Sequence, residues 1–113
     1  MYKMTGKNIN LTINSWEIKD LQALPLRIDE IAIWWLGQAG FAVRACSNTF
    51  LIDPYLSNSL ARKYVGSRFP HDSLVPVPVN PATLTGVDWV FCTHRYTNHM
   101  DPETLRFLAH NPN

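Results

Sequence analysis

The stretch IAIWWLGQAGFAVRACSNTFLID, residues 31–53, decides the fold of this chain. It holds three runs of β-branched and aromatic residues, at 31–36, 41–46 and 49–53, which are separated by GQAG and by Ser47-Asn48. Such runs favour strands, and short breaks of this composition favour tight turns. The sequence therefore predicts three consecutive strands, mostly antiparallel, with Gly37 and Gly40 in the first turn.

The pattern within these runs predicts which faces are covered. IAIWWL is apolar on both faces, which is typical of a strand between two layers, whereas FAVRAC alternates and predicts that Arg44 faces water. Trp34 and Trp35 are neighbours on one strand, so they point to opposite faces and at least one of them belongs to the core.

The segments before and after the strands are expected to be less regular. Residues 1–30 are predicted to form an N-terminal helix over Thr5–Trp16 and a connector with at most one helical turn, because Ile9 and Ile13 are four apart and Pro25 breaks the connector. Residues 54–86 are rich in proline, which favours an extended loop.

A fourth strand is predicted over residues 87–93, VDWVFCT, and a helix over residues 102–110, PETLRFLAH. Asp101 is placed to cap this helix and Pro102 occupies its first position. One helix face carries Leu105, Leu108 and Ala109. The chain of 113 residues is thus expected to form one domain or part of one, of the α/β (α+β) class.

Composition excludes several classes of protein. The chain is 46% hydrophobic and 12% aromatic, which indicates a globular core, and its formal charge of +1 gives no reason to expect nucleic acid. The longest apolar stretch, 31–36, is far shorter than a membrane span, and residues 1–10 lack a signal-peptide core. We therefore expect a cytoplasmic protein without a membrane contact, with Cys46 and Cys92 as reduced, partly buried thiols.

The segment THRYTNHMD, residues 93–101, places two histidines in the loop between the fourth strand and the last helix. Neutral imidazoles are common ligands of catalytic metal ions, and a loop at the end of a rigid strand can present them. The alternative is that His94 and His99 are hydrogen-bonded loop residues that bind no ion.

The sequence contains a predicted strand followed by the histidine loop and a helix that starts with Asp-Pro, and it contains the segments WWLGQAGF (34–41) and LIDPYLS (51–57). With these features it resembles the metallo-β-lactamase fold superfamily, in its branch related to L-ascorbate-6-phosphate lactonase. The resemblance covers about residues 31–113 and matches the N-terminal part of that fold. It implies a four-layer αββα sandwich, mostly antiparallel with flanking helices. It also implies zinc or manganese, with a metal-bound hydroxide that attacks a lactone, a phosphodiester or a similar small ester, as in a lactonase or a phosphodiesterase.

The same resemblance assigns residues to the metal site. His94 matches the first metal ligand and His99 the last, while Tyr96 stands in the place of a second histidine and Asn98 in the place of a metal-binding and catalytic aspartate. A phenol with a pKa of about 10 is a poor zinc ligand, and an amide has no charge to balance the ion. Asp53 matches an acidic residue that orients a ligand beside the metal loop.

Two functional hypotheses follow. In the first, the chain is the N-terminal part of a metal-dependent hydrolase whose remaining ligands lie outside it, so that its activity alone is impaired; His71 and His110 do not match those ligands. In the second, it is a non-catalytic half-fold that acts by pairing with itself or with a complementary chain. A weaker variant of the first is that Tyr96 retunes the site toward ferric iron.

Overall fold

The structure is a computed structural model that describes residues 2–5, 8–11, 17–73 and 75–110. The elements in chain order are β1 (Tyr2–Thr5), β2 (Asn8–Leu11), α1 (Ile18–Ala23), β3 (Ile31–Gly37), β4 (Gly40–Ala45), β5 (Asn48–Ile52), α2 (Ser59–Lys63), the 3₁₀ helix η1 (Pro81–Thr83), β6 (Trp89–Phe91) and α3 (Pro102–His110).

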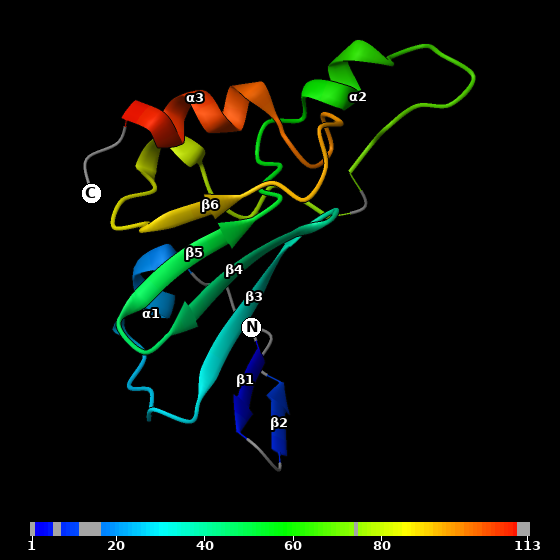
Figure 1. The fold of residues 1–113 in the computed structure, drawn as a ribbon. Coiled ribbons are helices and arrows are strands. Elements are labelled where there is room, and N and C mark those ends of the chain that lie inside the picture. The colour runs from blue at the N-terminus through cyan, green and yellow to red at the C-terminus, as the bar shows by residue number, and fades with distance from the viewer. Residues whose placement is uncertain (1, 6–7, 12–16, 74, 111–113) are drawn as a thin grey trace.

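One mixed sheet organises the chain, with its strands in the order β2-β1-β3-β4-β5-β6. All neighbouring strands pair antiparallel except β5 and β6, which are parallel. The three predicted strands and the α+β class are therefore confirmed, and the fourth strand is present but shorter than predicted. Figure 1 shows α2 and α3 beyond one end of the strands.

The turn between β3 and β4 depends on glycine. Gly37 has a φ of +94°, and a Cβ atom added to it would lie 3.0 Å from Cγ2 of Val75. Side chains rarely adopt this backbone region, and the space is already occupied. The predicted role of Gly37 in the first turn is confirmed.

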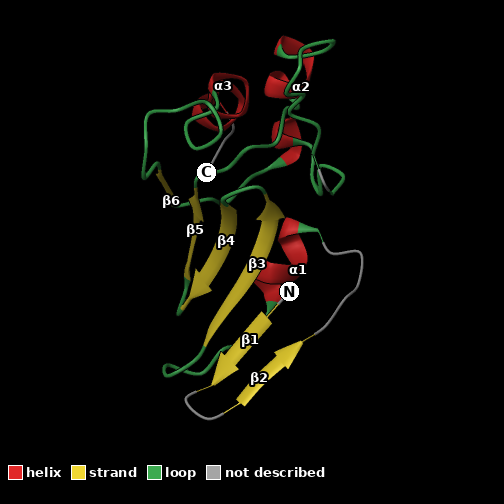
Figure 2. Ribbon diagram, turned by 90° about the vertical axis from the view of Figure 1, so that its right-hand side faces the viewer, coloured by secondary structure: helices red, strands yellow, loops and turns green. Residues whose placement is uncertain are grey.

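The core covers one face of the sheet. Leu21 of α1 packs there with Ala32 and Trp34 of β3, Leu51 of β5 and Leu84. Figure 2 shows α1 lying against the sheet beside β3. Trp34 is 7% exposed and Trp35 is 43% exposed, which confirms that the two rings point to opposite faces.

The prediction that Arg44 faces water is wrong. Its side chain lies on the covered face, where Nη1 donates hydrogen bonds to the carbonyl oxygens of Gln22 (2.9 Å) and Leu24 (3.1 Å). These carbonyls stand at the C-terminal end of α1, where the helix leaves acceptors unpaired and where a positive charge is favourable. Arg44 therefore ties α1 to the sheet.

The other face of the sheet is apolar and open, and we call it the open sheet face. The register aligns Ile33, Val43, Phe50 and Trp89 in one row, and Trp35, Phe41, Ile52 and Phe91 in the next. Directly paired residues share a face of a sheet. Trp89 is 63% exposed and Phe91 50% exposed, so this face lacks a cover within the described part of the chain.

The N-terminal helix prediction is wrong for residues that the structure describes. Thr5 ends β1, and Asn8–Leu11 form β2, which pairs with β1 antiparallel; residues 12–16 lie outside the described residues. The spacing of Ile9 and Ile13 suits a helix, but Asn and Thr in this segment are poor helix formers. The hairpin is favoured instead because β1 gains main-chain hydrogen-bond partners by pairing with β3.

Other expectations are corrected in part. The proline-rich segment 54–86 contains the short helices α2 and η1 rather than loop alone. On α3, Leu108 packs against the core as predicted, but Ala109 is exposed. Cys46 and Cys92 are free thiols as predicted, and both are exposed rather than partly buried. Among the described residues, no helix has the length and apolar character needed to cross a bilayer.

Candidate functional site

Parallel pairing of β5 with β6 creates the candidate site. Asp53 directly follows β5 and Thr93 lies two residues beyond β6, so both leave the sheet at the same edge. The Asp53 backbone N–H donates to the carbonyl of Phe91 at 2.8 Å, which extends the pairing by one bond. Asp53 has a φ of +46°, a left-handed conformation that aspartate tolerates and that often marks a functional position.

Asp53 is buried, at 3% exposure, and its carboxylate accepts from three donors. Its Oδ1 accepts from the Thr93 backbone N–H at 2.6 Å, and its Oδ2 accepts from the Thr93 hydroxyl at 2.5 Å. Oδ2 also lies 2.8 Å from His99 Nδ1. Burial alone raises the pKa of Asp53, but the hydrogen bonds from Thr93 and His99 together outweigh it and hold this pKa below its usual range.

His99 is oriented by this contact. A carboxylate can only accept, so the imidazole donates from Nδ1 and, when neutral, keeps its lone pair on Nε2. Histidines that bind metals are held in this way by a second partner on the other ring nitrogen. Asp53 therefore makes the contact with His99 that its expected orienting role requires.

His94 has a different environment. The Tyr96 backbone N–H donates to His94 Nδ1 at 3.2 Å, and the two rings lie 4.0 Å apart between centroids. A neutral His94 in this contact carries its proton on Nε2. Its ring centroid lies 5.6 Å from that of His99. Two imidazoles bound to one zinc ion at about 2.0–2.1 Å have centroids roughly 5 Å apart, so the loop brings these two predicted ligands to a suitable spacing.

The donor set fits only part of a metal site. Among the residues that the structure describes, no group of three or more His, Cys, Asp or Glu side chains gathers in one place. A catalytic zinc ion has three protein ligands and an open position. Here two imidazoles are near one another, while the carboxylate of Asp53 is occupied by Thr93 and His99.

The other two predicted metal positions line a cavity. Tyr96 and Asn98 belong to the loop segment 95–98, which forms one wall of a hollow of about 450 Å³. The rest of the lining consists of Gln38 from the turn after β3, Leu60 and Lys63 of α2, the adjacent Tyr64, and His71. Gln38 thus lines the same cavity as Tyr96 and Asn98, and so does His71, which was assigned no role from the sequence.

The cavity also contains cations that sequence reasoning missed. Lys63 and Arg95 both line it. The only signal in the sequence was the basic pair Arg62-Lys63, which carried no indication of what it would face. Contacts that bring residue 63 near residue 95 are set by tertiary packing and leave no local pattern.

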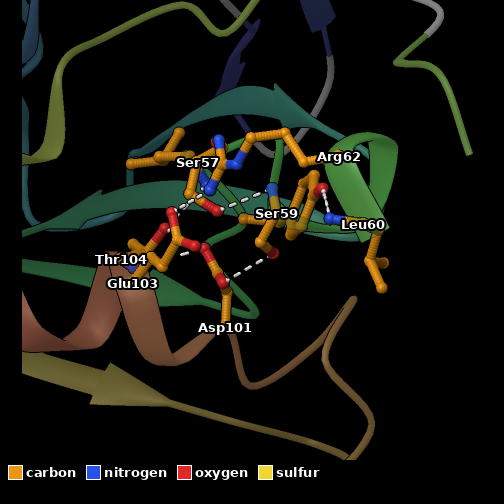
Figure 3. Close-up of polar contacts among 9 residues, drawn as sticks. Ser57, Ser59, Leu60, Arg62, Asp101, Glu103 and Thr104 are labelled. Carbon is orange, nitrogen blue, oxygen red and sulfur yellow. Dashed lines mark hydrogen bonds and ion pairs between the residues drawn. The ribbon is translucent and has the colours of Figure 1, made fainter. Parts of the chain in front are cut away.

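A polar network fixes the wall that α2 contributes (Figure 3). Asp101 is fully buried and accepts from the Thr104 hydroxyl at 2.5 Å and from the Ser59 hydroxyl at 3.0 Å. Arg62 pairs with Glu103 on α3. The start of α3 and the short helix α2 are therefore joined, and Asp101 caps α3 as predicted.

Comparison of the chain with the known protein families, with curated proteins and with solved structures found no match. What the site can do chemically is therefore inferred from its geometry.

Proposed function

We propose that this chain is the histidine-loop part of a metal-dependent hydrolase, built as the N-terminal portion of a metallo-β-lactamase-like αββα sandwich and directed at a small ester or lactone. The observation that supports this proposal best is the 2.8 Å contact between Asp53 and His99. A buried carboxylate that fixes one nitrogen of an imidazole is the usual partner of a metal-binding histidine.

The residues of this chain have separate tasks in that proposal. Thr93 holds the Asp53 carboxylate, Asp53 holds the ring, and His99 presents Nε2. His94 can offer the same nitrogen only if its proton moves to Nδ1 and the contact with the Tyr96 backbone is released. A bound zinc or manganese ion would supply a hydroxide near neutral pH.

Because two imidazoles are fewer than a catalytic ion needs, the chain alone is expected to bind zinc weakly and to hydrolyse slowly or not at all. Tyr96 adds little at neutral pH because it is a protonated phenol, and Asn98 adds no charge. Further ligands would come from outside the described residues.

The test is a calorimetric zinc titration of the whole chain and of three variants. His94→Ala and His99→Ala remove the proposed ligands, and His110→Ala is the control, since His110 lies at the end of α3 against the Arg106 carbonyl. We expect about one zinc per chain in the parent and in the control, with at least tenfold weaker binding in the other two. Equal binding in all four proteins, or none in the parent, would contradict the proposal.

A second candidate function is favoured by the open sheet face: a non-catalytic half-fold that pairs with a second copy of itself. Aromatic side chains present about 150–250 Å² each, and the exposed fractions of Trp35, Phe41, Trp89 and Phe91 together equal about two whole side chains, so they expose roughly 300–500 Å². This area is comparable to the largest apolar patch of a typical monomer, about 300–600 Å², and such patches are often functional. A stable interface covers roughly 800 Å² on each partner, so the aromatic patch would form the centre of such an interface. The face carries no charged side chain in its two central rows, so it can pack against its own copy.

Sedimentation equilibrium of the parent and of Trp89→Lys tests this candidate. The parent is expected to dimerise and the variant to be monomeric, because a buried lysine would leave an unpaired charge. Phe69→Lys is the control, since Phe69 is 72% exposed and lies outside the sheet. A parent that stays monomeric at high concentration would point to a different chain as the cover and would reject self-pairing.

A further inference from the structure

The cavity beside the histidine loop has an unusual chemical character. Of its lining residues, all but Leu60 carry an N–H or O–H group in the side chain, and none is Asp or Glu. The donors include the ammonium of Lys63, the guanidinium of Arg95 and the amides of Gln38 and Asn98. A cavity that offers donors and positive charge without a carboxylate is suited to an oxygen-rich anion.

Both cations are available. Within the described part of the chain, neither Lys63 nor Arg95 forms an ion pair with an acidic side chain, whereas the neighbouring Arg62 is paired with Glu103. Lys63 Nζ lies 5.2 Å from the centroid of the Tyr64 ring, a contact that keeps it near the cavity wall and leaves its charge uncompensated. An anion would supply the missing partner.

Two positions of the histidine loop belong to this cavity. Tyr96 and Asn98 line it, while His99 turns to Asp53. An aspartate at position 98 would place a negative charge on the wall and repel an anion, whereas the asparagine amide can donate to it. With asparagine at this position, the described lining residues of the cavity carry no negative charge that would repel an anion.

We infer that this cavity binds a small oxyanion, the phosphate or carboxylate group of a small molecule, through Arg95 and Lys63 with Asn98 and Gln38 as additional donors. Arg95 can hold two oxygens with its planar fork, and Lys63 supplies a point charge. The network around Asp101 holds α2 against α3, so the wall that carries Lys63 is in place before a ligand arrives (Figure 3). This binding requires no metal ion and does not rest on the proposed hydrolase function.

The experiment is an amide NMR titration of metal-free protein with inorganic phosphate and, separately, with malonate, at constant ionic strength maintained with chloride. Saturable shifts are expected at residue 63 and at residues 95–98. Arg95→Ala and Lys63→Ala are each expected to weaken binding about tenfold, because each removes a charge-assisted hydrogen bond. Arg68→Ala, which removes a cation that contacts Phe69 outside the cavity, is expected to leave binding unchanged.

Tighter binding of phosphate than of malonate would identify a phosphate-bearing ligand, and the reverse a carboxylate. Shifts that fail to saturate with either probe, or an Arg95→Ala variant that binds like the parent, would overturn the inference. The variant Asn98→Asp distinguishes the oxyanion site from the proposed metal site, because phosphate binding should weaken while zinc binding strengthens. Failure of zinc to bind would leave the phosphate result unaffected.

Discussion

His99 Nδ1 lies 2.8 Å from Asp53 Oδ2, although 46 residues separate the two along the chain. The parallel pairing of β5 with β6 brings them together, because Asp53 and the loop that begins at Thr93 leave the sheet at one edge. Removing the carboxylate would leave donors of Thr93 and His99 without their acceptor in a partly buried position. The local fold and the orientation of His99 therefore depend on the same side chain.

Asp53→Asn should lower the free energy of unfolding by about 1–3 kcal/mol, since an amide cannot accept all three hydrogen bonds and its N–H₂ faces donors. Urea denaturation measures this change. Asp29→Asn is the matched control, because Asp29 is exposed and pairs with Arg27 at the surface, and such pairs contribute little. A variant as stable as the control would show that the carboxylate has no structural role.

Protonation of the Asp53 carboxylate should also lower the stability of the fold in acid. Unfolded aspartate has a pKa of about 3.9 and the pKa of Asp53 in the folded state is lower, so its contribution is complete above about pH 5 and decreases as the pH drops through the folded value. Between pH 7 and pH 2.5, the midpoint temperature of thermal unfolding should fall more steeply for the parent than for Asp53→Asn. If the midpoint temperatures of the two proteins fall in parallel, the lowered pKa is not that of Asp53.

Arg44→Met tests the attachment of α1. The methionine can fill much of the space but cannot donate to the carbonyl oxygens of Gln22 and Leu24, so we expect a loss of about 1–3 kcal/mol in chemical denaturation. Arg106→Met, on the exposed side of α3, should change stability little. If the denaturation midpoint of Arg44→Met equals that of the parent, water replaces the guanidinium as donor to these carbonyls with no loss in the free energy of unfolding.

The double substitution Tyr96→His with Asn98→Asp should raise zinc affinity at least tenfold, because it adds an imidazole and a negative charge beside His94 and His99. Calorimetric titration at pH 7 measures the gain, and Tyr96→Phe with Asn98→Ala is the control that changes the same positions without adding ligands. If affinity stays the same, the loop does not direct these positions toward a common ion.

The central strands were predictable because their signal is local. Runs of β-branched and aromatic residues between short turns indicate β3, β4 and β5, and Asp101-Pro102 indicates the start of α3. The contact between Asp53 and the histidine loop was anticipated only through the family resemblance.

Other features depend on contacts between distant segments. The hairpin of β1 and β2 is stabilised by pairing with β3, which outweighs a helical spacing. The five-residue helix α2 is held by Tyr55, whose hydroxyl accepts from the Leu60 N–H at 2.8 Å, and by the pairing of Arg62 with Glu103. A short window of sequence contains neither β3 together with the hairpin nor Glu103 together with α2, and it does not contain the residues that line the cavity.

The most direct measurement is a long-range ¹H–¹⁵N spectrum of the histidine side chains, recorded before and after addition of one equivalent of zinc. The account predicts that His99 carries its proton on Nδ1 in the free protein, as the contact with Asp53 requires, and that zinc shifts the Nε2 resonance of His99 while Nδ1 stays protonated. A His99 protonated on Nε2, or a spectrum that zinc leaves unchanged, would contradict it.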